Sequence, residues 1–223
     1  MSILLHGDCL EEMKSLDDKS IDLIFCDLPY GQTSCKWDCK IDLEKFWIEV
    51  MRIKKLNTPI FMTTTTKFGV ELINSAPNKL KFFDLVWVKS APTGFLLAKK
   101  MPLRKHEMIY VFYEKLPFYD LSSHTHKFIK DKECGGHQRR YDPPLPNTML
   151  EIKSTRGKHS TEKPVALMEW ILKYYSKEGD VVLDPTMGSG STGVACKNMN
   201  RNFIGIEKDP DIYEGVYQRL YSF

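Results

Sequence analysis

Residues 21–30 read IDLIFCDLPY, an apolar run that ends in an acid, a leucine, a proline and a tyrosine. The run over 21–26 predicts a buried parallel strand, because its length suits a strand and an acid and Pro29 cut it off. Open α/β sheets hold their ligands at the carboxyl ends of such strands, where Asp27 falls. Leu28 precedes a proline and is pushed toward extended geometry, while Pro29 has a fixed φ. The stretch thus predicts a strand that delivers a rigid loop to a ligand site.

This loop offers one carboxylate, fixed carbonyl acceptors and one aromatic face. Such groups suit the task of making an exocyclic amino group of a nucleobase nucleophilic, because its lone pair is delocalised into the ring until acceptors hold its hydrogens. Asp27 and the Leu28 carbonyl could accept those hydrogens, and Tyr30 could stack on a base taken out of the duplex. An acidic strand end followed by an ordinary turn would give the same residues, so a second signal is needed.

A second loop has the pattern of a nucleotide cofactor site. Residues 181–183 predict a strand, and the stretch 184–193 that follows reads DPTMGSGSTG. The glycines that fit G-x-G-x-x-G are Gly188, Gly190 and Gly193. Glu207 ends the next strand, where an acid can hold ribose hydroxyls. Asp184 argues against a dinucleotide, because a pyrophosphate expects backbone amides rather than a carboxylate, whereas a sulfonium cofactor with an ammonium group tolerates it.

The rest of the chain alternates between strand and helix patterns. Strands are also expected over residues 3–5, 59–64, 82–88, 106–113 and 203–206. Helices are expected over residues 10–16, 42–54, 67–74, 165–175, from the glycine loop through 199, and 211–221. The sequence therefore predicts an α/β fold in one domain over 1–223, with a seven-stranded, mostly parallel sheet and helices on both faces. The strands 82–88 and 106–113 should form a long hairpin at one end of the sheet.

Composition excludes few classes of function. The chain has 223 residues, 42% of them hydrophobic and 27% charged, and a net charge of +3, which permits a nucleic-acid partner without requiring one. Apolar stretches fall short of the roughly 18 residues of a membrane span and the N-terminus lacks a secretory pattern, so we expect a cytoplasmic protein without a membrane partner. Cys35, Cys39, Cys134 and His137 lack zinc-knuckle spacing, and we expect no metal.

Residues 115–158 break the alternation, and no clear element is expected there. Basic and aromatic side chains are interleaved in this segment, as a surface that binds a nucleic-acid backbone and stacks on bases requires. A solvated loop with ordinary surface lysines would have the same composition. Long irregular segments in compact domains are often functional, and Arg139, Arg140 and Arg156 are candidate contacts to a nucleic-acid backbone in this one.

Together these stretches resemble the S-adenosylmethionine-dependent amino-methyltransferases of DNA, the adenine-N6 and cytosine-N4 family, in the motif order of its beta group. Residues 27–30 look like the catalytic D-P-P-Y motif, and 159–164 (HSTEKP) are similar to the H-P-T-Q-K-P segment. Residues 184–192 resemble the cofactor loop and 203–207 the ribose-binding strand. The resemblance covers nearly the whole chain. It implies a Rossmann-like fold with a circularly permuted motif order, in which 115–158 form a target-recognition insertion.

The resemblance also implies roles for single residues. The catalytic set would be Asp27, Leu28, Pro29 and Tyr30. The cofactor set would be Asp8, Cys9, Thr161, Lys163, Asp184, Pro185, Thr186, Gly188, Gly190, Ser191, Thr192 and Glu207. In that set Asp8 and Cys9 would lie by the cofactor adenine, Glu207 by the ribose, and Lys163 by the amino-acid end together with Thr161, Asp184 and Thr192. Cys9 fits a core position equally well, and Lys163 fits a solvated helix start. Ser160 and Glu162 depart from the family's proline and neutral amide.

The implied activity is transfer of a methyl group from S-adenosylmethionine to the N6 amino group of adenine in double-stranded DNA, in the setting of restriction and modification. Asp27 favours adenine, since the cytosine-amino enzymes of the family more often carry Ser there. Alternatives are a cytosine-N4 or RNA substrate and a catalytically silent DNA-binding module. A nicotinamide oxidoreductase is a further alternative, which Asp184 argues against. The segment 115–158 is short for the family, which predicts either a short recognition site or a homodimer.

Overall fold

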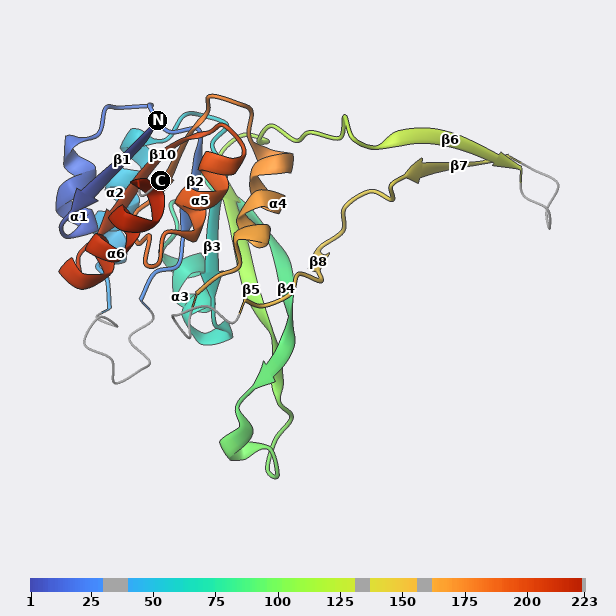
Figure 1. Cartoon of the computed structure of the whole chain (residues 1–223), viewed down its shortest axis with the longest axis horizontal. Helices are drawn as coiled ribbons and strands as arrows, with labels where there is room; N and C mark the ends of the chain where they lie inside the picture. Colours follow the sequence, from blue (N-terminus) through green and yellow to red (C-terminus); the bar gives the residue numbers. More distant parts are fainter. Residues whose placement is uncertain (30–39, 131–136, 156–161, 222–223) are drawn as a thin grey trace.

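The structure is a computed structural model that describes residues 1–29, 40–130, 137–155 and 162–221, with the backbone alone at 127–130 and 137–140. Within these residues eight strands form one sheet in the order β1-β10-β9-β2-β3-β5-β4-β8 (Figure 1). Their bounds, in that order, are Ser2–His6, Asn202–Glu207, Val181–Asp184, Leu23–Cys26, Ile60–Thr64, Arg104–Tyr113, Lys81–Thr93 and Met149–Leu150. The pairs from β1 to β3 are parallel, β5 is antiparallel to β3 and to β4, and β8 is parallel to β4.

Helices cover both faces of the sheet (Figure 1). They are α1 (Cys9–Glu12), the 3₁₀ turn η1 (Met13–Ser15), α2 (Leu43–Ile53), α3 (Thr66–Ser75), α4 (Val165–Tyr175), α5 (Ser191–Asn198) and α6 (Pro210–Tyr221). Strand β2 shows why two layers form, because successive side chains of a strand point to opposite faces. Leu23 and Phe25 pack in the cluster that contains α4, α5 and α6. Ile24 and Cys26 pack with α1, α2 and α3 on the other face.

The expected fold class is confirmed. All seven expected strands form, and the two strands expected as a hairpin pair from Lys81 with Tyr113 to Thr93 with Arg104. β8 is an additional, two-residue strand at the edge. The expectation of no regular element over 115–158 is wrong, since β6 (Thr125–Lys130) and β7 (His137–Asp142) form an antiparallel ribbon in that segment.

The ribbon β6–β7 stands off the sheet beyond β4, and its two ends are joined near the carboxyl end of α4 (Figure 1). His124 lies between them, with Nδ1 2.9 Å from the Pro143 carbonyl oxygen and Nε2 3.0 Å from the Tyr174 hydroxyl. The Asp120 N–H donates to the Tyr174 carbonyl at 2.8 Å. The ribbon is thus rooted where α4 ends, at the edge of the sheet at which the parallel strands begin.

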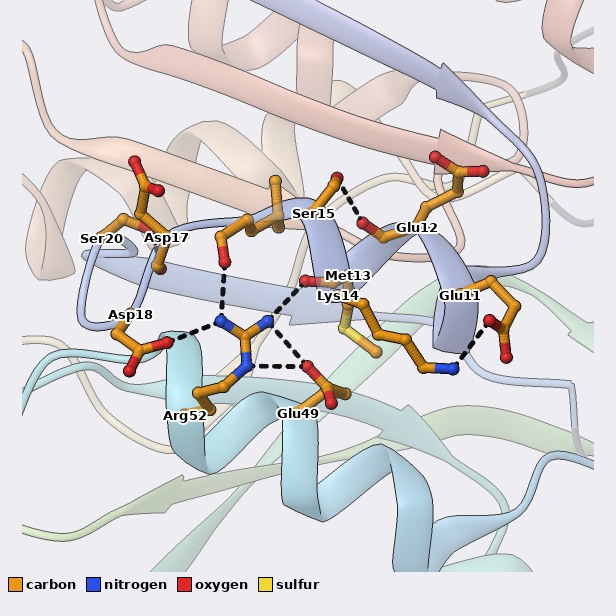
Figure 2. A network of polar contacts seen from close by, with 11 residues as sticks. Glu11, Glu12, Met13, Lys14, Ser15, Asp17, Asp18, Ser20, Glu49 and Arg52 are labelled. Carbon is orange, nitrogen blue, oxygen red and sulfur yellow. Dashed lines mark hydrogen bonds and ion pairs between the residues drawn. The ribbon is translucent and has the colours of Figure 1, made fainter.

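Arg52 fastens the first helical segment to α2 at this same edge, as Figure 2 shows. Its guanidinium donates to the carbonyl oxygens of Met13 and Leu16, at 2.8 and 2.7 Å, and pairs with Asp18 and Glu49, both at 2.7 Å. Hydrogen bonds to these two carboxylates raise the pKa of Arg52 above its ordinary value. In the described part of the chain, no helix has the length and apolar character needed to span a membrane.

Candidate active site

Four carboxylates lie at one edge of the sheet. Asp8 follows β1, Glu207 ends β10, Asp184 ends β9 and Asp27 follows β2, and these four strands are adjacent and parallel. From β9 the chain continues through α5 to β10 on one side, whereas from β2 it continues through α2 to β3 on the other. Ligands of open α/β sheets bind at such a switch point, at the carboxyl ends of the strands. The structure therefore brings together the acids that the sequence singles out.

Asp27 is held from two sides. The Thr63 hydroxyl, at the end of β3, donates to Oδ1, and the Lys163 ammonium lies 2.5 Å from Oδ2. Burial alone would lower the pKa of Lys163, but the carboxylates of Asp27 and Glu107 outweigh it and raise that pKa above its ordinary value. The Lys163 side chain is only 12% exposed, so it is not a solvated lysine at a helix start. It contacts the proposed catalytic acid directly.

A second carboxylate and a second ammonium group extend this pair. Glu107 Oε2, on β5, lies 3.6 Å from Lys163 Nζ, and Glu107 Oε1 lies 2.7 Å from Lys89 Nζ on β4. Negative and positive groups therefore alternate from Asp27 through Lys163 and Glu107 to Lys89. Sequence reasoning missed Glu107, Lys89 and Thr63. For Glu107 and Lys89 a signal was available, since both are charged residues in or next to β-rich stretches, and charged side chains are rarely buried in strands unless they are paired.

Asp184 is the most deeply buried of the four acids, at 2% exposure. Its Oδ2 accepts from the Thr192 hydroxyl at 2.6 Å, and its Oδ1 accepts from the Thr186 N–H at 3.2 Å. Burial, with the charges of Asp27 and Glu207 added, raises the pKa of Asp184 to about 7, although both hydrogen bonds act to lower it. A cation beside this carboxyl group would favour its ionised form.

Glu207 connects the glycine loop to the end of β10 by a hydrogen bond. Its Oε2 accepts from the Gly188 N–H at 3.1 Å, and its Oε1 accepts from the N–H groups of Lys208 and Asp209, both at 2.9 Å. Burial raises the pKa of Glu207. Gly190 precedes α5 with a φ of +79°, and a Cβ there would meet Val216 at 2.7 Å, so the loop conformation requires glycine at this position.

Asp8 and Cys9 lie side by side but in different surroundings. Asp8 caps α1 through the Leu10 N–H at 3.0 Å and pairs with Lys208 at 3.1 Å. Burial would raise the pKa of Asp8, but Lys208 and the Leu10 N–H outweigh it and lower that pKa. Cys9 packs in the cluster of α1, α2 and α3, and burial raises the pKa of its thiol to about 12. Its thiol is therefore neutral at ordinary pH, as for a core residue.

Glu162, which departs from the family pattern, accepts two hydrogen bonds. Its Oε1 accepts from the Ser191 hydroxyl at 3.0 Å and from Arg219 Nη1 at 2.7 Å. Arg219, on α6, also donates to the Ser189 carbonyl at 2.8 Å. The segment before α4 is thereby fastened to the glycine loop by an acid and an arginine, and Arg219 is a further residue that sequence reasoning missed.

The remaining residues that the sequence singles out lie in several different places. Leu28 is buried, Pro29 follows it, and Pro185 is buried directly after β9. Tyr30, Thr161 and Arg156 lie outside the described residues, as do Cys35, Cys39 and Cys134. Arg139 and Arg140 lie on β7, opposite Phe128 and Lys127, on a ribbon rooted away from the edge that holds Asp27. Among the described residues, no group of three or more His, Cys, Asp or Glu is placed to hold a metal ion.

The polar groups around the glycine loop fit a cationic nucleoside cofactor. Asp184 has a buried carboxyl group with a raised pKa, and a positive charge beside it would favour ionisation. Glu207 provides hydrogen-bond acceptors at the end of the adjacent strand. The Thr186 Oγ1 atom is buried and has no hydrogen-bond partner among the described residues. A buried hydroxyl without a partner is costly, which suits a position that a bound polar ligand completes.

Comparison with known proteins places these features in a family. The model of a family described as DNA methylase, the N6 and N4 methyltransferases, matches residues 21–218. The type II methyltransferase M.HinfI of Haemophilus influenzae is 28% identical over 99% of this chain and 68% of its own length. The crystal structure of the M1.HpyAVI complex with S-adenosylmethionine is 26% identical, with a TM-score of 0.73 over 99% of this chain and 100% of the other.

A further solved structure shows how widely the fold is shared. The PvuII DNA methyltransferase, described as cytosine-N4-specific, superposes with a TM-score of 0.75 over 99% of this chain and 86% of its own, at 16% identity. At that identity the likeness concerns the fold alone. The fold therefore accommodates more than one target base, and the choice of base has to be argued from the residues of the site.

Proposed function

Because the chain belongs to the S-adenosylmethionine-dependent N6/N4 DNA methylase family, we propose that it methylates the N6 amino group of adenine in double-stranded DNA. The contact of Asp27 with both Lys163 and Thr63 carries this proposal, since it fixes a hydrogen-bond acceptor at the switch point of the sheet. Asp rather than Ser at this position favours adenine over cytosine within the family. The relatives named as type II methyltransferases suggest a role beside a restriction enzyme.

The proposed roles follow from the positions of the groups. The Asp27 carboxylate and the Leu28 carbonyl accept hydrogen bonds from the adenine amino group, and Tyr30 stacks on the flipped base. The cofactor supplies an electrophilic methyl group on its sulfonium sulfur. As the amino nitrogen gains positive charge during attack, the carboxylate of Asp27 stabilises that charge and accepts the surplus proton. Lys163 and Thr63 hold the carboxylate in one orientation.

Cofactor binding is assigned to the neighbouring strand ends. Asp184 would hold the positively charged group at the amino-acid end of the cofactor, together with the hydroxyl groups of Thr186 and Thr192. Lys163 would lie by the same end of the cofactor. Glu207 accepts from the ribose hydroxyls once the loop at Gly188 yields its contact. Asp8 lies by the adenine ring, and Cys9 contributes a neutral, apolar wall. The remaining members of the cofactor set are Thr161, Pro185, Gly190 and Ser191.

We also propose that the chain is one methyltransferase domain with 115–158 as its target-recognition insertion. Arg139, Arg140 and Arg156 would contact DNA from it. A two-stranded ribbon is marginal in water unless it packs on something else, and β6–β7 stands off the sheet (Figure 1). A second copy of the chain would cover it. A solution mass equal to one 25.9 kDa chain, in a fully active preparation, would exclude the homodimer.

Asp27→Asn tests the catalytic role. The amide keeps the size of the side chain but loses the negative charge, so methyl transfer should fall by about 100- to 1,000-fold. The affinity for S-adenosylmethionine, measured by calorimetry, should stay within about threefold of the wild type, because other residues hold the cofactor. Loss of cofactor binding together with activity would instead assign Asp27 a structural role.

A further inference from the structure

The tip of the β4–β5 hairpin, residues 93–104, extends past the rest of the sheet (Figure 1). Its base is the pair of Thr93 with Arg104, and it contains Gly94, with a φ of +93°, and the 3₁₀ turn η2 (Phe95–Leu97). The tip forms no part of the two buried clusters. It is therefore a projecting element that the stability of the fold does not explain.

The hairpin tip projects from the same edge as the active site. Met108 of β5 pairs with Thr64 at the end of β3, next to Thr63, which bonds Asp27. From that level β5 extends four more residues to Arg104, a distance of about 14 Å at strand geometry. The tip thus stands beyond the level of Asp27, at the edge of the sheet that carries the four acids. The ribbon β6–β7, in contrast, is rooted at the opposite edge.

Large apolar side chains are left in water at this tip. Leu96 is fully exposed, Phe95 is 66% exposed and Met101 is 55% exposed, with Leu97 also largely exposed. Removal of such side chains from water is favourable, so their exposure leaves binding energy available. A gathered set of exposed apolar side chains on a projecting element marks a surface that binds something.

Positive charge surrounds these apolar side chains. Residues 93–106 contain Lys99, Lys100, Arg104 and Lys105 and no aspartate or glutamate. None of these four forms an ion pair with another described residue. Cations without a protein counter-charge complement a phosphate backbone. Apolar side chains flanked by cations are what DNA-bending proteins insert between base steps.

We propose that the hairpin tip is a DNA-binding finger, whose lysines contact phosphates and whose Phe95 and Leu96 enter the base stack beside the flipped nucleotide. This inference rests on the proposed function, because a base taken out of the duplex leaves a gap. Extrusion costs a few kcal/mol of stacking and pairing, and apolar side chains that fill the gap offset part of that cost. The reach of about 14 Å exceeds the depth of a DNA groove, about 8.5 Å.

Two variants separate the parts of the finger. Phe95→Ala with Leu96→Ala should lower kcat/KM on matched duplex DNA by about 10- to 100-fold, because less of the flipping cost is offset. On a duplex with an abasic site opposite the target adenine, where the base is already unpaired, the same variant should come within about threefold of the wild type. The matched control is Ile48→Ala with Leu56→Ala, two exposed apolar residues on α2 and just after it, which should behave as the wild type on both duplexes.

Lys99→Gln with Lys100→Gln should weaken DNA binding and reduce the slope of log K against log salt by about 2, since each phosphate contact contributes about 0.9. Cofactor affinity should be unchanged in both variants. An unchanged salt slope with unchanged duplex activity overturns the proposal. So does a shift of solution mass from dimer to monomer in the tip variants, which would assign the tip to a second copy. If the wild type methylates no DNA, the proposed function fails, and the salt slope still tests the finger.

Discussion

At Asp27, one carboxylate oxygen faces the hydroxyl of Thr63 and the other faces the ammonium group of Lys163. Each carboxylate oxygen has two lone pairs, so these contacts orient the group and still leave it able to accept from a substrate amino group. The site can therefore present an oriented hydrogen-bond acceptor, which under the proposed function would also accept the surplus proton of the amino nucleophile.

Replacement of Lys163 tests this arrangement. Lys163→Met keeps the apolar stem but removes the charged group that orients Asp27, so kcat of methyl transfer should fall by about 10- to 100-fold. The residue contacts Asp27 and Glu107 with an ammonium group, and Lys163→Arg should restore part of the rate. An unchanged kcat, with only the KM for the cofactor raised, would show that Lys163 serves the cofactor alone.

The raised pKa of Asp184 predicts that cofactor binding depends on pH. Its pKa of about 7 lies above the ordinary 3.8 because of burial and the charges of Asp27 and Glu207. If the cofactor's positive end favours the ionised form, binding releases a proton. Calorimetry should then show the affinity rising by up to about tenfold per pH unit as pH approaches about 7, and levelling above it. In Asp184→Asn the affinity should not depend on pH in this way. A wild-type affinity that stays constant between about pH 5.5 and 7 would contradict the prediction.

The same pKa sets the sign of a stability change. Between pH 3.8 and about 7 the folded protein holds a proton on Asp184 that the unfolded chain has lost. The free energy of unfolding of the cofactor-free protein, measured in urea, should therefore receive a contribution from Asp184 that falls as pH rises through this window. That contribution should be absent in Asp184→Asn, and a pH dependence equal in both proteins would contradict it.

The acids of the site could be predicted from the sequence, and most of their partners could not. Asp27, Asp184 and Glu207 each close an apolar run, and parallel strands end at one edge, so their proximity follows from the fold class. Lys163 contacts Asp27 although the two residues are 136 positions apart in the sequence, and Thr63 contacts it from 36 positions away. Such contacts depend on which strands become neighbours, and no local pattern encodes that.

Helix α4 and the ribbon β6–β7 show the same contrast between elements. The boundaries of α4, Val165–Tyr175, match the expected helix because one side of it is buried in the core and its apolar spacing is visible. In the part of the chain that the structure describes, β6 and β7 pair with each other and with no other strand. Their sequences carry no alternation of apolar and polar residues, so the segment could not be recognised as strands.

Arg52 joins two elements, and its loss should affect stability alone. Arg52→Met removes hydrogen bonds to the carbonyl oxygens of Met13 and Leu16 and to two carboxylates (Figure 2). The free energy of unfolding in urea should fall by about 2–3 kcal/mol. Methyl transfer per folded molecule should not change, because Arg52 lies at the edge opposite the site.

The control for Arg52 is Lys14→Met. Lys14 forms an exposed pair with Glu11, at 2.7 Å, in the same region (Figure 2), and exposed pairs contribute under about 1 kcal/mol. This variant should unfold at nearly the wild-type urea concentration. Equal stability of the two variants would mean that Arg52 does not hold the first helical segment in place.

The molecule as a whole combines one sheet with two projections. The sheet unites strands from both ends of the chain, with β1 beside β10 and β2 beside β9, so Asp27 and the glycine loop lie at one edge although Asp27 and Asp184 are 157 positions apart. The hairpin tip projects from the edge that carries these acids, and the ribbon β6–β7 is rooted at the other. Under the proposed function, this division would give the protein one element to engage DNA at the site and another for flanking DNA or a second copy.

The most direct test is to identify the methylated nucleoside. Purified protein is incubated with isotope-labelled S-adenosylmethionine and unmethylated double-stranded DNA, and the DNA is digested and analysed by mass spectrometry. The account predicts label in N6-methyladenine, with the signal lost in Asp27→Asn. Label in N4-methylcytosine, or in no nucleoside while the protein binds the cofactor, would contradict it.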